Sequence, residues 1–183
     1  QRKTKIILHT TIVENNINEL GKIVELGEDL KVDLIRFGHS TFFTEEDILK
    51  NKLAMGKLFP EETIEEISYS YDPKDMAQIY YDKISKFMKE YDGRFSVTPD
   101  LSLDEIRNWY SSYFKSSRRC YFVYRGVFIY PNGDVVPCES FKFVLGNINE
   151  EPFLDIWNST KAIKFRKGLK KGLYPGCARC CKL

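Results

Sequence analysis

Hydrophobic positions at the start of the chain follow a strand period, then a helix period, then a strand period again. Residues 5–12 are rich in β-branched and aliphatic side chains and form a segment short enough for a buried strand. Residues 17–30 carry hydrophobic side chains at helical spacing, and Asn16 is the expected N-cap. A second strand is expected over residues 32–37, with Gly38 ending it. This order predicts a βαβ unit with parallel strands, because right-handed crossovers are the usual connection; an antiparallel pair with a helical excursion is the alternative.

Three further helices are predicted between residues 44 and 113. The first is expected to begin after Thr44, where three acidic residues suit a first helical turn. Asp72 is the expected cap of the second, and Ser102 with Glu105 forms a capping box for the third. The first is expected to end near residue 59, and a short strand at residues 94–98 precedes the third. The second helix has the most regular apolar stripe, interpreted as core, which consists of Met76, Ala77, Tyr80, Ile84, Phe87, Met88 and Tyr91.

The hydrophobic pattern changes after the third of these helices. Residues 121–124 and 127–130 are strand-like, and residues 131–134 contain an Asn-Gly pair that suits the positive φ angles of a tight hairpin. Residues 135–138 are expected to return antiparallel to the preceding strand. Farther along, a helix interrupted near residues 158–159 is predicted.

The composition of the chain limits its size and its partners. A chain of 183 residues with 43% hydrophobic residues can bury one good core, or one core and a small module. The formal net charge is only +2, and the 28 basic and 26 acidic residues are interspersed, so no basic face for nucleic acid is expected. No apolar run approaches the roughly 20 residues of a membrane span, and the first residues lack the apolar core of a secretory signal. We therefore expect a soluble, cytoplasmic protein without a membrane partner, and the opening Gln1 suggests a fragment of a longer protein.

The five cysteines lie after residue 119, and three of them crowd the C-terminus. Without a secretory signal, they point to metal or redox chemistry rather than to disulfides. Cys120 and Cys138 flank the predicted hairpin, and Cys177 and Cys180 form a Cys-x-x-Cys loop. Two such pairs can converge on one zinc ion or one iron–sulfur cage, and the spacing does not separate these two. Cys181 is interpreted as a small core side chain, a substitute ligand for Cys180, or a cysteine that binds no metal.

The order and spacing of several short motifs after Cys120 match a known pattern. Twelve residues separate Cys120 from Gly133, and four separate Gly133 from Cys138. The later matching segments are residues 146–148, 155–159 and 175–180. Together these motifs resemble the SPASM and twitch domains that follow the barrel in many radical S-adenosylmethionine (SAM) enzymes. Because the sequence stops at Leu183, it is similar to the shorter twitch type, which has one auxiliary cluster.

The resemblance implies an α/β fold in two parts. Residues 1–115 are expected to be the C-terminal part of a partial TIM-type barrel with connecting helices, and residues 116–183 a small twitch domain of hairpin and helix. The second part is expected to bind one [4Fe–4S] cluster through Cys120, Cys138, Cys177 and Cys180. Since barrel active sites lie at the carboxyl ends of the strands, a role in binding SAM or substrate is expected for Thr10, Thr11, Gly38 and His39. The alternatives are that the threonines are ordinary strand residues and that His39 only hydrogen-bonds the loop.

The resemblance also implies an oxidoreductase. The intact enzyme would cleave SAM reductively at a second [4Fe–4S] cluster, held by an upstream Cys-x3-Cys-x2-Cys that this sequence lacks. The resulting 5′-deoxyadenosyl radical would abstract a hydrogen atom from a peptide or small-molecule substrate. The auxiliary cluster is expected to transfer electrons or position substrate, a reductant protein is an expected partner, and this chain alone is expected to be inactive. The alternative is a noncatalytic zinc or iron–sulfur module for a protein partner, and the aromatic content of 14% suits such an interface.

Overall fold

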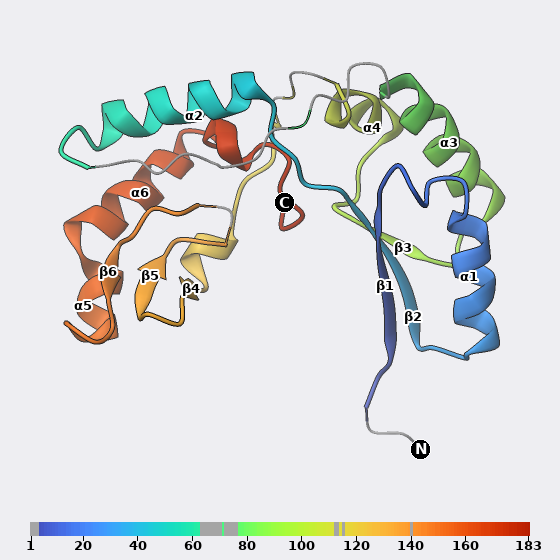
Figure 1. The fold of residues 1–183 in the computed structure, drawn as a ribbon, viewed down its shortest axis with the longest axis horizontal. Coiled ribbons are helices and arrows are strands. Elements are labelled where there is room, and N and C mark those ends of the chain that lie inside the picture. Colours follow the sequence, from blue (N-terminus) through green and yellow to red (C-terminus); the bar gives the residue numbers. More distant parts are fainter. Residues whose placement is uncertain (1–3, 63–70, 72–76, 112–113, 115, 140) are drawn as a thin grey trace. The chain divides into compact units, whose positions relative to one another are not determined.

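The computed structural model describes residues 4–62, 71, 77–111, 114, 116–139 and 141–183. The chain divides into two compact units, of which the first comprises residues 1–41 and 73–114 and the second residues 42–72 and 115–183. In the described parts, each unit has a three-stranded sheet and its own helices (Figure 1). The protein is therefore of the mixed α/β class, as predicted.

The first unit is built on a parallel sheet. Its strands are β1 (Ile7–Ile12), β2 (Leu34–His39) and β3 (Ser96–Thr98), and they lie in the order β1-β2-β3. Helix α1 (Leu20–Asp29) connects β1 to β2 (Figure 1). This arrangement confirms the predicted βαβ unit and excludes the antiparallel alternative.

Two local predictions for this unit are wrong. Gly38 does not end β2, because it pairs with Thr11 on one side and with Thr98 on the other. Asn16 does not cap α1, because its side chain is used in the loop that precedes the helix. Its Oδ1 accepts a hydrogen bond from the backbone N–H of Val13 at 2.9 Å, and its Nδ2 donates to the carbonyl oxygen of Thr11 at 2.8 Å. An Asn side chain can satisfy nearby backbone groups in this way outside a helix.

Two helices complete the first unit in the described residues, α3 (Ala77–Glu90) and α4 (Leu103–Trp109). The predicted capping box at the start of α4 is confirmed, because the Ser102 side chain accepts a hydrogen bond from the backbone N–H three residues later. The predicted start of α3 at Asp72 and the apolar position at Met76 lie outside the described residues.

Alternate side chains of β2 point into the core of the first unit. Ile35, Phe37 and His39 are all buried. The ring of Phe37 packs edge-on against Phe87 of α3, with 5.1 Å between the ring centroids. The apolar stripe of α3 therefore covers this face of the sheet, as its helical spacing predicts.

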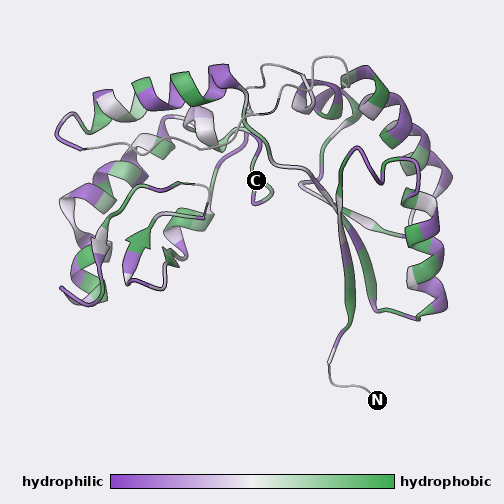
Figure 2. Ribbon diagram, viewed as in Figure 1, coloured by the Kyte–Doolittle hydropathy of each residue, from purple (hydrophilic) through white to green (hydrophobic). Residues whose placement is uncertain are grey.

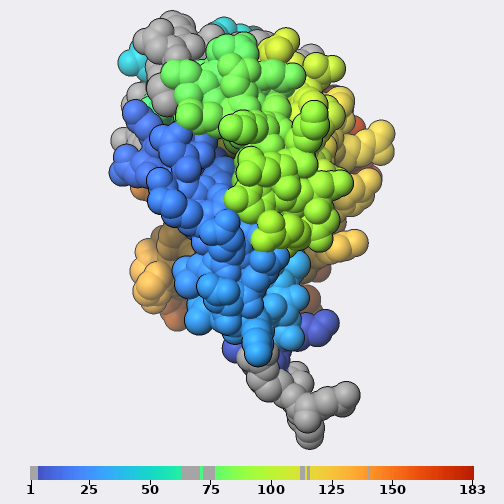
Figure 3. Space-filling view, turned by 90° about the vertical axis from the view of Figure 1, so that its right-hand side faces the viewer, coloured from blue at the N-terminus to red at the C-terminus, as the bar shows by residue number. Residues whose placement is uncertain are grey.

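Residues of α1, of α3 and of the segment before α1 line a shallow groove of about 290 Å³. Figure 3 shows this side of the first unit. Charged residues of both signs line the groove, including Lys22, Glu25, Lys83, Lys86 and Glu90. The mixture of signs agrees with the interspersed charge of the sequence and gives no concentrated basic face here.

The second unit combines short strands with several helices. Its described elements are α2 (Glu45–Leu58), η1 (Phe122–Tyr124), β4 (Phe128–Ile129), β5 (Asp134–Val136), β6 (Gly146–Asn147), α5 (Phe153–Asn158), α6 (Thr160–Lys170) and η2 (Pro175–Cys177), where η denotes a 3₁₀ helix. The strands form an antiparallel sheet in the order β4-β5-β6, and the pairing of β4 with β5 is antiparallel as predicted.

In the second unit, the predictions for two helix boundaries are correct and the prediction of one strand is wrong. Helix α2 begins after Thr44 with an acidic first turn, as predicted, and Thr44 forms a capping box with Asp47. The predicted interruption between α5 and α6 is present at Ser159, whose hydroxyl accepts a hydrogen bond from the backbone N–H of Ala162. The strand predicted over residues 121–124 is wrong, because this segment turns locally into the 3₁₀ helix η1.

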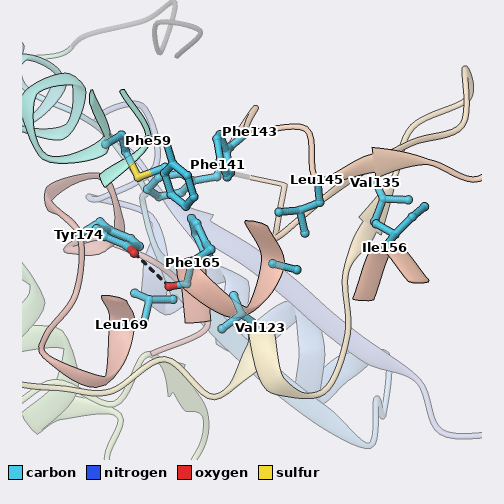
Figure 4. Packing of buried hydrophobic residues seen from close by; sticks show 12 residues of the cluster. Phe59, Val123, Val135, Phe141, Phe143, Leu145, Ile156, Phe165, Leu169 and Tyr174 are labelled. Atoms are coloured by element: carbon cyan, nitrogen blue, oxygen red, sulfur yellow. Dashed lines mark hydrogen bonds between the residues drawn. The ribbon is translucent and has the colours of Figure 1, made fainter. Parts of the chain in front are cut away.

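The second unit has its own hydrophobic core, shown in Figure 4. Phe165 of α6 lies near its centre and contacts other aromatic rings, which belong to Phe141, Phe143 and Tyr174. The Tyr174 hydroxyl donates a hydrogen bond to the carbonyl oxygen of Phe165 at 2.9 Å, so this buried polar group has a partner. Helix α2 contributes Met55 and Phe59 to the same core.

Hydropathy along the ribbon agrees with burial only in part. The prediction of a buried strand at residues 5–12 is wrong for most of β1, because of its residues only Ile12 is buried. Hydrophobic residues concentrate in β1 and β2, whereas hydrophilic and hydrophobic residues alternate along α2 and α3 (Figure 2). Among the helices of the described residues, none has the length and apolar character needed to cross a membrane.

Candidate metal centre

Four cysteines of the second unit line one small cavity. They are the four that the sequence singles out, Cys120, Cys138, Cys177 and Cys180. The cavity has a volume of about 20 Å³, and most of its remaining wall is apolar, with Phe122, Val123, Phe141, Phe165 and Leu169 among the lining residues. Segments up to sixty positions apart along the chain thus bring their thiols to a common, mostly apolar space.

Hydrogen bonds to the backbone or the sulfur hold three of these cysteines in place. Cys138 directly follows Pro137 after β5, and its carbonyl oxygen accepts a hydrogen bond from the N–H of Phe141 at 3.1 Å. Cys177 ends η2, and its N–H donates to the carbonyl oxygen of Tyr174 at 2.8 Å. Cys180 follows on the same loop, and its sulfur accepts a bond from the N–H of Lys182 at 3.5 Å. An N–H directed at a cysteine sulfur is a feature that tunes metal-bound thiolates.

The thiols around the cavity influence one another electrostatically. Burial is the main cause of a raised pKa at Cys177, and the nearby Cys138 and Cys120 raise this pKa further. The sulfur atoms of these three cysteines therefore lie close enough to repel one another when more than one of them is deprotonated. A bound cation would relieve that repulsion, because metal binding requires deprotonated thiolates.

Cys181 has different surroundings from the four cavity cysteines. It is exposed, and its side chain forms a hydrogen bond with that of Cys180. This hydrogen bond raises the pKa of Cys180 and lowers the pKa of Cys181. The interpretation of Cys181 as a small core side chain is therefore wrong, because its side chain faces solvent.

The donor set of four cysteines is that of a zinc ion or of an iron–sulfur cluster. A zinc ion with bonds of about 2.3 Å to four tetrahedral thiolates would need sulfur atoms about 3.8 Å apart. Among the residues that the structure describes, no group of three or more His, Cys, Asp or Glu side chains is gathered closely enough to hold one metal ion. Four thiols are equally the ligand set of an iron–sulfur cage, in which the ligating sulfurs lie farther apart than around one ion.

Helix α2 contacts the loop that carries Cys177 and Cys180. Nothing in the sequence predicts this contact. The Asp47 carboxylate forms a buried ion pair with Arg179, a residue between these two cysteines. Burial is the largest influence on Arg179 and lowers its pKa, while Asp47 opposes this shift. The sequence marks Asp47 only as an acidic residue in the first turn of a helix, and no local signal identifies a partner 132 positions away.

The residues predicted to bind SAM or substrate lie at the carboxyl ends of two strands in the first unit. Thr10 and Thr11 belong to β1, and Thr11 pairs with Gly38 of β2. His39 is only 2% exposed, and its Nδ1 lies 3.0 Å from the hydroxyl oxygen of Tyr110. Burial lowers the pKa of His39 to about 4, and its Nε2 has no hydrogen-bond partner among the described residues. The structure thus brings Thr11 and Gly38 together, whereas the ring of His39 lies in the core; the binding roles stay predictions.

Comparison with known proteins identifies the part of the chain that carries the cysteines. The SPASM family, described as an iron–sulfur cluster-binding domain, matches residues 120–181. The S-adenosyl-L-methionine-dependent 2-deoxy-scyllo-inosamine dehydrogenase of Niallia circulans is 47% identical over 53 residues, which are 27% of this chain. The match covers 21% of that enzyme, so the chain spans about a fifth of the length of this curated relative. No solved structure gives a significant match. The two matches together support a SPASM-type protein of the radical SAM family.

Proposed function

We propose that Cys120, Cys138, Cys177 and Cys180 ligate one auxiliary [4Fe–4S] cluster in the C-terminal part of a radical SAM enzyme. The observation that carries this proposal is the shared cavity that all four thiols line. The match of residues 120–181 to an iron–sulfur cluster-binding family supports it independently. Cys181 is outside the proposed ligand set, because its side chain is exposed and bonds to Cys180.

Electron transfer is the role that this ligand set favours. Four cysteines occupy one coordination position on each of four irons, which leaves no iron open to a substrate. The apolar lining formed by Phe122, Val123 and Phe141 keeps water from the thiols and lowers the local dielectric. When bound, the cluster would supply a one-electron acceptor or donor.

The proposed reaction of the whole enzyme is an oxidation. The curated relative is named a dehydrogenase. A dehydrogenation removes two electrons and two protons from its substrate, and a hydrogen atom taken by the 5′-deoxyadenosyl radical accounts for one of each. The second electron needs an acceptor, and the second proton needs a base. We propose the auxiliary site of this chain as that acceptor, for a peptide or small-molecule substrate, with a reductant protein supplying the electron that cleaves SAM at a second cluster.

The proposal also assigns the two parts of the chain to the parts of a radical SAM enzyme. We propose that residues 1–115 are the end of a partial TIM-type barrel and that residues 116–183 are a twitch-type domain. The parallel strands β1, β2 and β3 suit a barrel wall. Thr10, Thr11, Gly38 and His39 are then near SAM or substrate, and a cytoplasmic location suits oxygen-sensitive clusters.

A series of serine variants tests the proposed ligands. The chain is reconstituted anaerobically with iron and sulfide, and iron content and visible absorption are measured. We expect a brown protein with about four irons in the wild type, and strong loss of iron in each single variant of the four cavity cysteines. Cys181→Ser is the matched control and should keep wild-type iron. A colourless chain that takes up a single zinc ion would instead support the noncatalytic module.

A further inference from the structure

We infer that helix α2 is part of the cluster-binding site, with Asp47 and Asn51 as positioning residues for the loop of Cys177 and Cys180. This inference rests on the proposed function, since it assumes that those cysteines hold a cluster. It extends beyond the SPASM match, which covers residues 120–181, because α2 spans Glu45–Leu58.

The first contact is the buried ion pair between Asp47 and Arg179. The exposed fractions of the two side chains are 2% for Asp47 and 1% for Arg179. The Arg179 guanidinium also lies over the ring of Phe42, 4.5 Å from its centroid. Burying either charge alone is unfavourable, so each residue needs the other in place. Because Arg179 lies between Cys177 and Cys180, the pair fixes the middle of the cysteine loop.

The second contact involves Asn51 one turn later on α2. Its side-chain oxygen Oδ1 accepts a hydrogen bond from the backbone N–H of Gly176 at 3.1 Å, and this bond is buried. A Cβ atom at Gly176 would come within 3.0 Å of the Asn51 side chain, so the loop approaches the helix too closely for a larger residue. Gly176 directly precedes Cys177, so this contact fixes the start of the loop.

The two contacts come from one face of the helix. Asp47, Asn51 and Met55 are four residues apart, which places them above one another on an α-helix. All three are buried, and Met55 belongs to the core against which Cys120, Cys138 and Cys177 pack. This α2 face therefore supports the loop with an ion pair and a hydrogen bond, and Met55 adds to the core against which Cys177 packs.

The capping box of α2 ties the ion pair to the start of the helix. Oδ2 of Asp47 accepts hydrogen bonds from the backbone N–H and the hydroxyl of Thr44, at 3.0 and 2.9 Å. The same oxygen atom faces Arg179. The position of the carboxylate is thus determined from both sides, as expected of a residue that positions others.

The test compares Asp47→Asn and Asn51→Ala with the matched control Glu46→Gln. Glu46 lies on the same helical turn but is exposed and pairs with Lys50. All chains are reconstituted anaerobically, and three quantities are measured: the rate of iron release to a chelator, the electron paramagnetic resonance spectrum of the reduced cluster, and its midpoint potential. We expect both test variants to release iron at least tenfold faster than the wild type, with a changed spectrum or potential. Glu46→Gln should match the wild type.

Folding effects are separated by thermal unfolding of the apo chains and by the double variant Asp47→Asn with Arg179→Gln. The double variant leaves no buried charge without a partner, so it should restore part of the iron retention that Asp47→Asn loses. Test variants with wild-type release rate, spectrum and potential overturn the inference, even where the apo chain is less stable. A wild-type chain that takes up no iron overturns the proposed function itself, and the inference with it.

Discussion

The imidazole of His39 and the hydroxyl of Tyr110 meet inside the first unit, with 3.0 Å between Nδ1 and the oxygen. Tyr110 is 1% exposed and stacks on Tyr80, with ring centroids 4.3 Å apart. The ring of Trp109 lies 5.9 Å from the His39 ring. These surroundings solvate a charged imidazole poorly, so the native state favours neutral His39.

The first prediction is a loss of stability of the first unit in mild acid. The pKa of His39 is about 4 in the folded protein, against an ordinary value of 6.5. The unfolded chain therefore binds the proton more readily, and the stabilising effect is complete above pH 6.5 and is lost as the pH falls towards 4. The full effect is roughly 3 kcal/mol, since each pKa unit corresponds to about 1.36 kcal/mol.

Urea unfolding at several pH values measures this effect. Trp109 lies in the first unit, so its fluorescence reports this unit once Trp157 is replaced by Phe. In His39→Gln the decrease between pH 6.5 and 4 should be much smaller than in the parent chain. An equal decrease in both chains would show that other groups cause the acid sensitivity.

The second prediction concerns the turn that precedes β5. Gly133 has a φ of +91°, and a Cβ atom there would lie 2.2 Å from the Asn149 side chain and 2.5 Å from that of Asn147. Gly133→Ala should therefore destabilise the chain by about 1–3 kcal/mol.

Gly56→Ala is the control, because Gly56 lies inside α2 with open space around it. This change should stabilise by about 0.5–1 kcal/mol, since alanine has the higher helix propensity. Urea unfolding followed by circular dichroism gives both values, and similar effects of the two changes would contradict the account.

The third prediction tests the core beside the cysteine cavity. Phe165 is 2% exposed and contacts Phe141, Phe143 and Tyr174. Phe165→Ala should lower the free energy of unfolding by roughly 3–5 kcal/mol, because it removes a large buried ring and leaves a cavity. Iron retention should fall as well, since Phe165 also lines the cysteine cavity. Ile163→Ala, two residues away and 37% exposed, should cost much less and leave iron retention unchanged. Chemical unfolding and iron analysis on the same samples decide between these outcomes.

Periodicity and capping residues predicted most of the fold. Strand and helix periods located β1, α1 and β2. The acidic turn after Thr44 and the capping box at Ser102 located the starts of α2 and α4. These signals are local, so they can be recognised in a single sequence. Gly38 was misassigned for the opposite reason, because its partners on β1 and β3 decided its structure. Residues 121–124 were misassigned because a local turn formed where the composition favoured a strand.

The candidate site was predictable only in part. Cysteine spacing selected four residues that the structure gathers around one cavity. The support from α2 was not predictable, because the pairing of Asp47 with Arg179 and of Asn51 with Gly176 links positions more than a hundred residues apart. Nothing in the local sequence distinguishes Asp47 from the exposed acidic residues Glu45 and Glu46 beside it.

The ratio of iron to acid-labile sulfide, together with Mössbauer spectroscopy, tests the central claim most directly. Because this sequence lacks the upstream Cys-x3-Cys-x2-Cys, any cluster bound by the reconstituted chain reports the four-cysteine site alone. We predict about four irons and four sulfides per chain, with all irons in similar sulfur environments, and loss of this signal in Cys177→Ser. A chain that binds one zinc ion and no sulfide would contradict the account.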